Sequence, residues 1–175
     1  MRTYTLIVPD SSPLITLAMA GALDLLLRPG LKIIIPDGVH WEVARDANLA
    51  GATDIIEWMK HNPGQVVIYP TQEFANQQTL IAAGVKRVRG LGERCALEAV
   101  EDGVEKDPDA RGILLYEDSD IRLLAIVNTD KIDTLTTADF LAELERAQLI
   151  QSADQILDQA VQAGRSEGIR RRSGT

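Results

Sequence analysis

Residues 8–15 read VPDSSPLI and connect a first predicted strand to a first predicted helix. Residues 6–8, LIV, form a short apolar run, which is typical of a buried strand. Ser12 followed by Pro13 is the pattern of a helix N-cap with proline at the first helical position. Asp10 therefore lies where the strand ends, and a carboxylate at that position requires an explanation.

The rest of the chain continues this alternation of strands and helices. Short apolar runs of the kind found in parallel strands covered on both faces occur at Tyr4–Val8, Leu31–Ile35, Val66–Tyr69 and Ile113–Tyr116, with a weaker one at Lys131–Leu135. Helical patterns cover Pro13–Leu27, Gly38–Arg45 and residues 52–61, 72–83, 91–102, 120–127, 138–147 and 153–163. This order predicts an α/β fold, a three-layer α/β/α sandwich with a central, mostly parallel sheet.

The length and charge of the chain narrow the class of protein. Its 175 residues suffice for one domain with a substantial core, and we assign residues 1–163 to that domain and the basic residues 164–175 to a flexible tail. The formal net charge of −8 argues against a broad nucleic-acid surface but leaves room for a local one. With one cysteine, Cys95, and neither a signal-peptide pattern nor an apolar span, we expect a cytoplasmic protein with no membrane partner.

Acidic residues follow two of the predicted strands. Asp10 comes after the first, and the run ILLY is followed by Glu117, Asp118 and Asp120. Because ligands of open parallel sheets bind beyond the carboxyl ends of the strands, we expect these acids at the functional edge. The alternative is that they form turns and helix caps. Two acid-rich strand ends weaken that alternative, since two like charges about 4 Å apart repel by about 4 kcal/mol at an effective dielectric constant of about 20.

Two further acids lie within predicted helices. Glu42 borders the apolar face of the pattern at Gly38–Arg45, and Glu93 begins the apolar stripe of residues 91–100. A carboxylate on an apolar face is costly unless it is paired or binds a metal. The alternatives are a salt bridge between Glu42 and Arg45, and stabilisation of Glu93 by the helix dipole.

Four carboxylates can thus converge at one edge of the sheet: Asp10, Glu42, Glu93 and Asp118. Because the sequence has no cluster of Cys or His, such a site offers only oxygen ligands, which suit one or two Mg²⁺ or Mn²⁺ ions rather than Zn²⁺. Metal ions held in this way activate water and stabilise the leaving oxygen in phosphodiester hydrolysis.

A short basic stretch provides a local site for RNA despite the negative net charge. It consists of Lys86, Arg87 and Arg89, which precede the helix of Glu93, while Arg122 lies close to the acids in sequence. These side chains are suited to gripping phosphates and leave sequence choice to the shape of the RNA. The alternative is an ordinary solvated loop.

Four stretches resemble PIN-domain proteins, in the same order along the chain. VPDSSPLITLAMAGALDLL resembles the opening of the branch whose first motif is Asp-Ser-Ser-Pro-Leu-Ile, and GLGERCALEAV resembles its Gly-Glu helix. ILLYEDSDIRLLA resembles its strand that ends in two acids, and TTADFLAELERAQLI resembles its late helix. The resemblance covers residues 5 to about 163 and implies an α/β/α sandwich nuclease, typically the toxin of a VapBC-like toxin–antitoxin pair.

The resemblance also implies roles for individual residues and partners. It carries the metal-binding acids onto the four carboxylates named above, with Asp120 as an auxiliary ligand. The implied activity is that of an endoribonuclease dependent on Mg²⁺ or Mn²⁺ that leaves a 5′-phosphate. The implied partners are RNA, a small antitoxin and a second copy of the chain. The apolar helices predicted at 52–61 and 72–83 are candidates for these protein contacts, with core packing as the alternative.

The chain departs from the family pattern at its late positions. Glu117 stands where an aspartate is more usual, and Asp139 replaces a late glycine. Since Asp139 also fits a pattern in which it is the last acid, the fourth ligand stays open between Asp118 and Asp139. Thr137 occupies the late threonine position, and Ser11 or Thr137 is a candidate to hold a water or a phosphate oxygen.

Two other functions compete with the ribonuclease. A catalytically weak PIN-fold module that acts through protein partners is compatible with the departures at Glu117 and Asp139, although no predicted ligand is missing. An unrelated phosphotransfer domain fits poorly, because phosphatases of the haloacid-dehalogenase type need Asp-x-Asp and position 12 is a serine.

Overall fold

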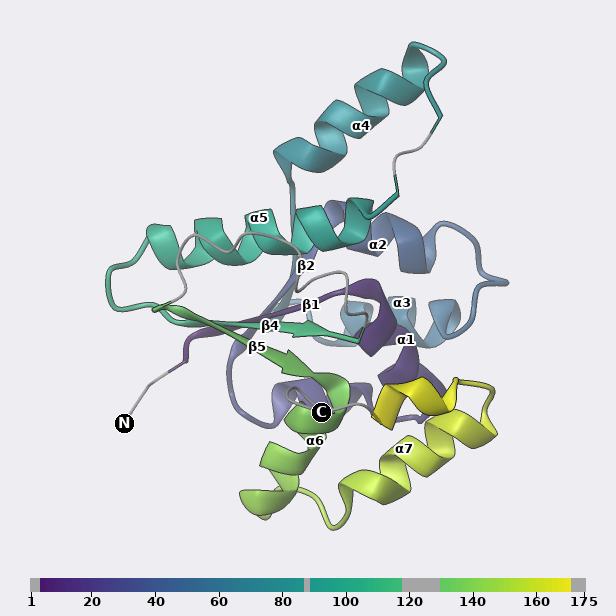
Figure 1. Ribbon diagram of the computed structural model, residues 1–175, viewed down its shortest axis with the longest axis vertical. Helices are drawn as coiled ribbons and strands as arrows, with labels where there is room; N and C mark the ends of the chain where they lie inside the picture. The colour runs from purple at the N-terminus through teal and green to yellow at the C-terminus, as the bar shows by residue number, and fades with distance from the viewer. Residues whose placement is uncertain (1–3, 87–88, 118–129, 171–175) are drawn as a thin grey trace.

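A parallel sheet with helices on both faces forms the centre of the protein (Figure 1). The computed structural model describes residues 4–86, 89–117 and 130–170. The strands are β1 (Leu6–Pro9), β2 (Lys32–Pro36), β3 (Val66–Tyr69), β4 (Gly112–Tyr116) and β5 (Ile132–Thr136). The helices are α1 (Ser11–Met19), η1 (Leu23–Leu27), α2 (Asp37–Ala44), α3 (Ala52–His61), α4 (Gln72–Ala82), α5 (Leu91–Glu105), α6 (Thr137–Arg146), α7 (Ala153–Gln162) and η3 (Glu167–Arg170).

The strands lie in the order β3-β2-β1-β4-β5, and every neighbouring pair is parallel. This confirms the predicted three-layer sandwich and its fifth strand, and it shows that the sheet is parallel throughout. The chain adds strands on one side of β1 and then moves to the other side, so β1 and β4 flank the point where the order reverses. In doubly wound sheets, the crevice at this point is the usual place for a ligand.

Buried side chains fill both interfaces of the sheet with its helices. Helix α5 lies across one face, against β1, β2 and β4, while α1, η1 and α6 lie on the other (Figure 1). Close packing of α5 depends on Gly103, because a methyl group there would lie 2.8 Å from a methyl carbon of Leu6. Helix α4 projects from the body on the side of α5, and we call this helix and the residues that follow it, up to Lys86, the α4 arm. No helix among the described residues has the length and apolar character needed to span a bilayer.

The start of the first helix differs from the prediction. Asp10 is the N-cap residue and the helix begins at Ser11, so Ser12 is not the cap and Pro13 stands at the third helical position. Proline is tolerated there because the first four N–H groups of a helix have no partner within the helix. The helix also ends early, at Met19, because Gly21 takes a positive φ of 63° and closes it.

The C-terminal segment is ordered where the sequence predicted a flexible tail. Residues 164–170 continue from α7 into η3, whose Ile169 is buried in the core. The boundary predicted at residue 163 therefore falls inside packed structure, while residues 171–175 lie outside the described part of the chain. The predicted helix at 120–127 also lies outside it.

Candidate functional site

The carboxyl ends of the strands bring the predicted acids to one edge of the sheet. Asp10 follows β1 and Glu117 follows the neighbouring strand β4, and the backbone N–H of Asp10 donates to the carbonyl of Leu115 at 2.8 Å. Glu42 comes from α2 and Glu93 from the first turn of α5, where the helix dipole favours a negative charge. The topological switch point is therefore surrounded by carboxylates.

Asp10 is the most unusual of these acids, because it is buried and incompletely paired. Its side chain is 4% exposed, and its Oδ1 accepts no hydrogen bond from any described residue. Burial, followed by the charge of Glu93, raises the pKa of Asp10 to about 8, and the charges of Glu42 and Glu117 act in the same direction. A buried carboxyl oxygen without a donor and facing other carboxylates is a position suited to a cation.

Two neighbouring residues allow Glu42 to lie close to Asp10: Ser11, which donates a hydrogen bond to it, and Gly92, which has no side chain. The Ser11 hydroxyl donates a 2.5 Å hydrogen bond to Glu42 Oε2. A methyl group on Gly92 would lie 2.5 Å from Glu42 Oε2 and 3.1 Å from Asp10 Oδ1. Gly92 therefore leaves the space in which these two carboxylates approach each other. The Arg45 guanidinium donates to the backbone carbonyl of Glu42 and lies 4.5 Å from the centre of the Trp41 ring.

Glu117 is fully engaged by neighbouring donors. The Thr137 hydroxyl donates to its Oε1 at 2.7 Å, and the Arg165 guanidinium donates to its Oε2 at 2.6 Å. The side chain of Glu117 is only 8% exposed, so this ion pair is largely screened from water. Both carboxylate oxygens of Glu117 are therefore used in contacts with α6 and with the C-terminal segment.

Asp139 lies in the first turn of α6, directly after β5. It forms a capping box at the start of α6, in which Thr136 Oγ1 donates to Asp139 Oδ2 at 2.8 Å and the backbone N–H of Asp139 donates back to Thr136 Oγ1. The carboxylate thus has a structural role at the start of the helix.

Several predicted site residues lie outside the described chain: Arg87, Asp118, Asp120 and Arg122. Over residues 4–86, 89–117 and 130–170, no three Asp, Glu, His or Cys side chains are gathered closely enough to hold a metal ion. Among the described residues, Asp10, Glu42 and Glu93 lie at the same edge of the sheet, and the two acids predicted after Glu117 are outside the described part of the chain.

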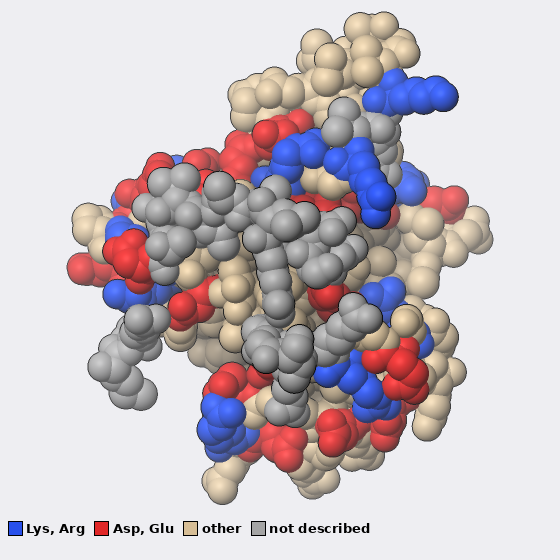
Figure 2. Space-filling view, viewed as in Figure 1, with Lys and Arg blue, Asp and Glu red and all other residues tan. Residues whose placement is uncertain are grey.

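The basic stretch begins just beyond the C-terminal end of α4, where the N–H of Val85 donates to the carbonyl of Leu80, and it ends at Arg89, just before α5. Lys86 and Arg89 are exposed, and basic side chains gather beside acidic ones in this region of the surface (Figure 2). Arg94 in α5 connects this stretch to α4, because its guanidinium donates both to the backbone carbonyl of Arg89 and to Glu73 of α4. Glu98 of α5 caps α4 by accepting the backbone N–H groups of residues 72 and 73.

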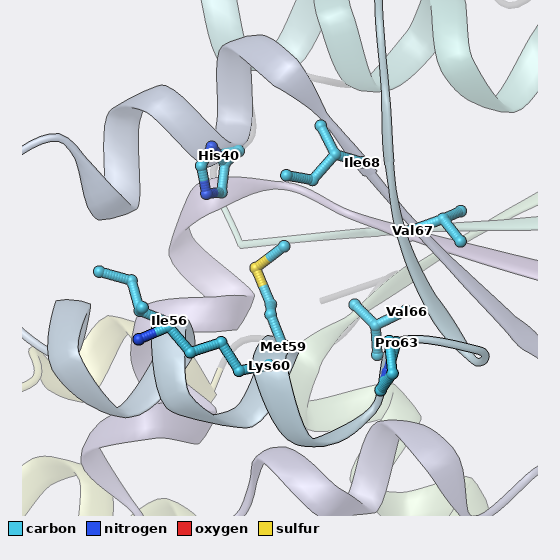
Figure 3. Close-up of a pocket in the computed structure, with 8 residues that line it drawn as sticks. All are labelled: His40, Ile56, Met59, Lys60, Pro63, Val66, Val67 and Ile68. Atoms are coloured by element: carbon cyan, nitrogen blue, oxygen red, sulfur yellow. The ribbon is translucent and has the colours of Figure 1, made fainter.

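A separate apolar cavity of about 490 Å³ lies between α3 and the edge strand β3 (Figure 3). It is lined by His40, Ile56, Met59, Lys60, Pro63, Val66, Val67 and Ile68. Burial lowers the pKa of His40, which favours the neutral imidazole. None of the predicted acids lines this cavity, so it is distinct from the acidic edge.

Two residues of the acidic edge were missed by the sequence analysis. Arg165 was assigned to the tail, although a glycine after a helical run, here Gly164, is the signal of a helix C-cap that keeps the following residue ordered. Gly92, which precedes Glu93, is the second of these residues. The space that it leaves for Glu42 depends on the packing of α2 against α5, for which the sequence carries no local signal.

Comparison with known proteins adds one match. A family model described as a PIN domain matches residues 6–166, which is most of the chain and includes Arg165. Among curated proteins, no sequence matches this chain.

Proposed function

This chain belongs to the PIN-domain family, a nuclease fold, and on that premise we propose that it is a metal-dependent ribonuclease. The single observation that carries the proposal is the buried Oδ1 of Asp10, which has no donor among the described residues and lies among carboxylates. Such an arrangement is unfavourable without a cation, and it supports a role for this edge in binding one.

The oxygen ligands of the edge fit Mg²⁺ or Mn²⁺. Asp10, Glu93 and Asp118 would hold the ion, with Asp120 as an auxiliary ligand. When bound, a divalent ion lowers the pKa of a coordinated water and neutralises charge on a phosphate. Ser11 fixes the Glu42 carboxylate by its 2.5 Å hydrogen bond, so Glu42 is positioned to orient a water molecule and to accept its proton.

RNA is the substrate that we propose, bound through its phosphates. Arg89 lies exposed just before α5, the helix that carries Glu93, and Lys86 lies exposed beyond the C-terminal end of α4. Positive charge at this position, together with Arg87 and Arg122, would offset the repulsion between the acidic edge and the RNA backbone. Thr137 is not part of this proposed contact, because it is fully buried and donates its one hydroxyl hydrogen to Glu117.

We further propose that the nuclease is the toxin of a cytoplasmic toxin–antitoxin pair and forms a homodimer. The support from the structure is the set of large apolar side chains left exposed on the arm and at the sheet edge: Ile68, Leu80, Ile81 and Val85. Groups of exposed apolar residues mark surfaces that bind other proteins. Coexpression with the neighbouring gene product, followed by sizing of the complex, tests this assignment.

The test of the activity is cleavage of a mixed RNA pool with Mg²⁺ or Mn²⁺. Wild type is expected to cleave, Asp10→Asn and Glu93→Gln are expected to lose at least about 100-fold in rate, and Asp54→Asn on the exposed surface of α3 serves as the matched control. Equal cleavage by all four proteins would point to a contaminating nuclease. Mn²⁺ binding without cleavage would favour the catalytically weak binding module.

A further inference from the structure

The backbone of Arg165 is fixed by the way α7 ends. Gly164 takes a φ of 111°, and its N–H donates to the carbonyl of Val161 while the N–H of Arg165 donates to the carbonyl of Ala160. This pair of hydrogen bonds is the Schellman motif, which needs a residue with positive φ at the position of Gly164. The C-cap of α7 therefore fixes the backbone of Arg165.

The Arg165 side chain contacts two separate elements at the acidic edge. Its Nη2 donates to Glu117 Oε2 at 2.6 Å, and its Nε donates to Thr16 Oγ1 of α1 at 2.8 Å. The guanidinium is 22% exposed, and Thr16 is fully buried. With Thr137 on the other oxygen, both oxygens of Glu117 have donors.

We propose that Arg165 is a positioning residue of the nuclease centre, whose ion pair with Glu117 keeps that carboxylate out of the set that binds the metal ion. This inference rests on the proposed function. Glu117 lies close enough to Asp10 to act on it electrostatically, so an unpaired Glu117 would offer the cation a further negative charge. Arg165 cancels that charge and fixes the C-terminal segment against β4 at the same time.

The inference is tested by Mn²⁺ binding, measured by calorimetry on the full chain without RNA. Arg165→Ala leaves Glu117 uncompensated and is expected to bind Mn²⁺ about tenfold more tightly than wild type, from Coulomb attraction at an effective dielectric constant of about 20. Arg165→Lys keeps the charge and is expected to keep the wild-type affinity. Arg165→Gln retains a polar side chain without the charge, and it is expected to bind Mn²⁺ as tightly as Arg165→Ala. It takes the place of Arg165→Ala in the experiment if Arg165→Ala does not fold.

Two further variants separate the ion pair from other effects. The double variant Arg165→Ala/Glu117→Gln is expected to bind Mn²⁺ with wild-type affinity, because it has no uncompensated negative charge at position 117. Arg170→Ala removes an arginine of the same segment that pairs with Asp158 and Glu167, and it is expected to leave Mn²⁺ affinity unchanged. A folded Arg165→Ala protein with wild-type affinity, or a gain that persists without Glu117, would overturn the inference alone. Absence of Mn²⁺ binding by wild type would overturn the proposed function and the inference with it.

Discussion

The hydroxyl of Ser11 lies 2.5 Å from Oε2 of Glu42, a residue 31 positions later in the chain. This contact joins the first residue of α1 to the second half of α2. It gives the Asp-Ser pair of the first motif two distinct tasks. Asp10 supplies a buried carboxylate, and Ser11 orients a second one beside it.

Loss of the Ser11 hydroxyl is expected to loosen Glu42. Ser11→Ala removes the donor, so we expect RNA cleavage to fall about tenfold and the free energy of unfolding to fall by about 1 kcal/mol, the usual value of one hydrogen bond. The adjacent Ser12→Ala is the matched control and should leave the rate unchanged. Equal rates for Ser11→Ala and the control would contradict the orienting role.

The protonation of Asp10 predicts how stability depends on pH without metal ions. Its pKa is about 8 in the folded protein against 3.8 ordinarily, so the favourable contribution of the protonated group is complete below pH 4 and is lost as pH rises to about 8. Asn at this position is neutral at every pH. With a chelator present, we expect Asp10→Asn to gain stability over wild type progressively between pH 4 and 8, by up to roughly 5 kcal/mol.

Thermal melting at several pH values measures this difference. Melting curves of wild type and Asp10→Asn that shift in parallel with pH would contradict the raised pKa. At pH 8, Mn²⁺ at about 100 times its Kd is expected to stabilise wild type by about 2.7 kcal/mol and Asp10→Asn much less.

Gly92, which directly precedes Glu93, is expected to be needed for activity and not for folding. Gly92→Ala places a methyl group 2.5 Å from Glu42 Oε2, which must move the carboxylate away from Asp10. We expect cleavage to fall at least about tenfold. Because alanine favours the helix by about 1 kcal/mol over glycine, we expect the melting temperature to stay level or rise. Gly64→Ala, where nothing lies within 4 Å, is the control. Full activity in Gly92→Ala would refute the steric argument.

The α4 arm is expected to fray when its cap is removed. Glu98 accepts the N–H groups of Gln72 and Glu73 at 2.6 and 2.9 Å, and a helix cap contributes about 1 kcal/mol. In Glu98→Ala we expect amide hydrogen exchange over residues 72–82 to accelerate by up to about tenfold, with the sheet unaffected. Glu57→Ala, which removes an exposed pair with Lys60, should leave that exchange unchanged. Unaltered exchange in both variants would show that the cap is dispensable.

The basic stretch predicts how RNA binding depends on salt. Replacing Lys86, Arg87 and Arg89 by alanine is expected to weaken RNA binding and to reduce the slope of log Kd against log salt, by about 0.7 for each phosphate that the protein no longer neutralises. A triple replacement of Lys60, Arg146 and Arg170, which lie in other regions of the surface, changes the net charge equally. If both triple variants weaken RNA binding equally, the change in affinity comes from net charge, and the basic stretch is not a local RNA site.

The strands and the acids at their ends were predictable because both are local signals. A run such as that of β1 indicates burial on both faces, and parallel strands always place their carboxyl ends at one edge. Asp10 and Glu117, which directly follow two of these strands, could thus be assigned to one edge before the strand order was known. The cap of α1 was misplaced by two residues, because the strand continues through Pro9 until the Asp10 N–H bonds to Leu115 of β4.

By itself, the sequence determined the sandwich and the positions of Asp10 and Glu117 after the carboxyl ends of two strands. Only the tertiary structure decided what each carboxylate contacts: Glu117 pairs with Arg165, 48 residues away, and Gly92 leaves room for Glu42. The physical reason is the range of the signals. Periodicity and caps act over a few residues, whereas the choice of a partner across the chain depends on how whole helices pack around the sheet.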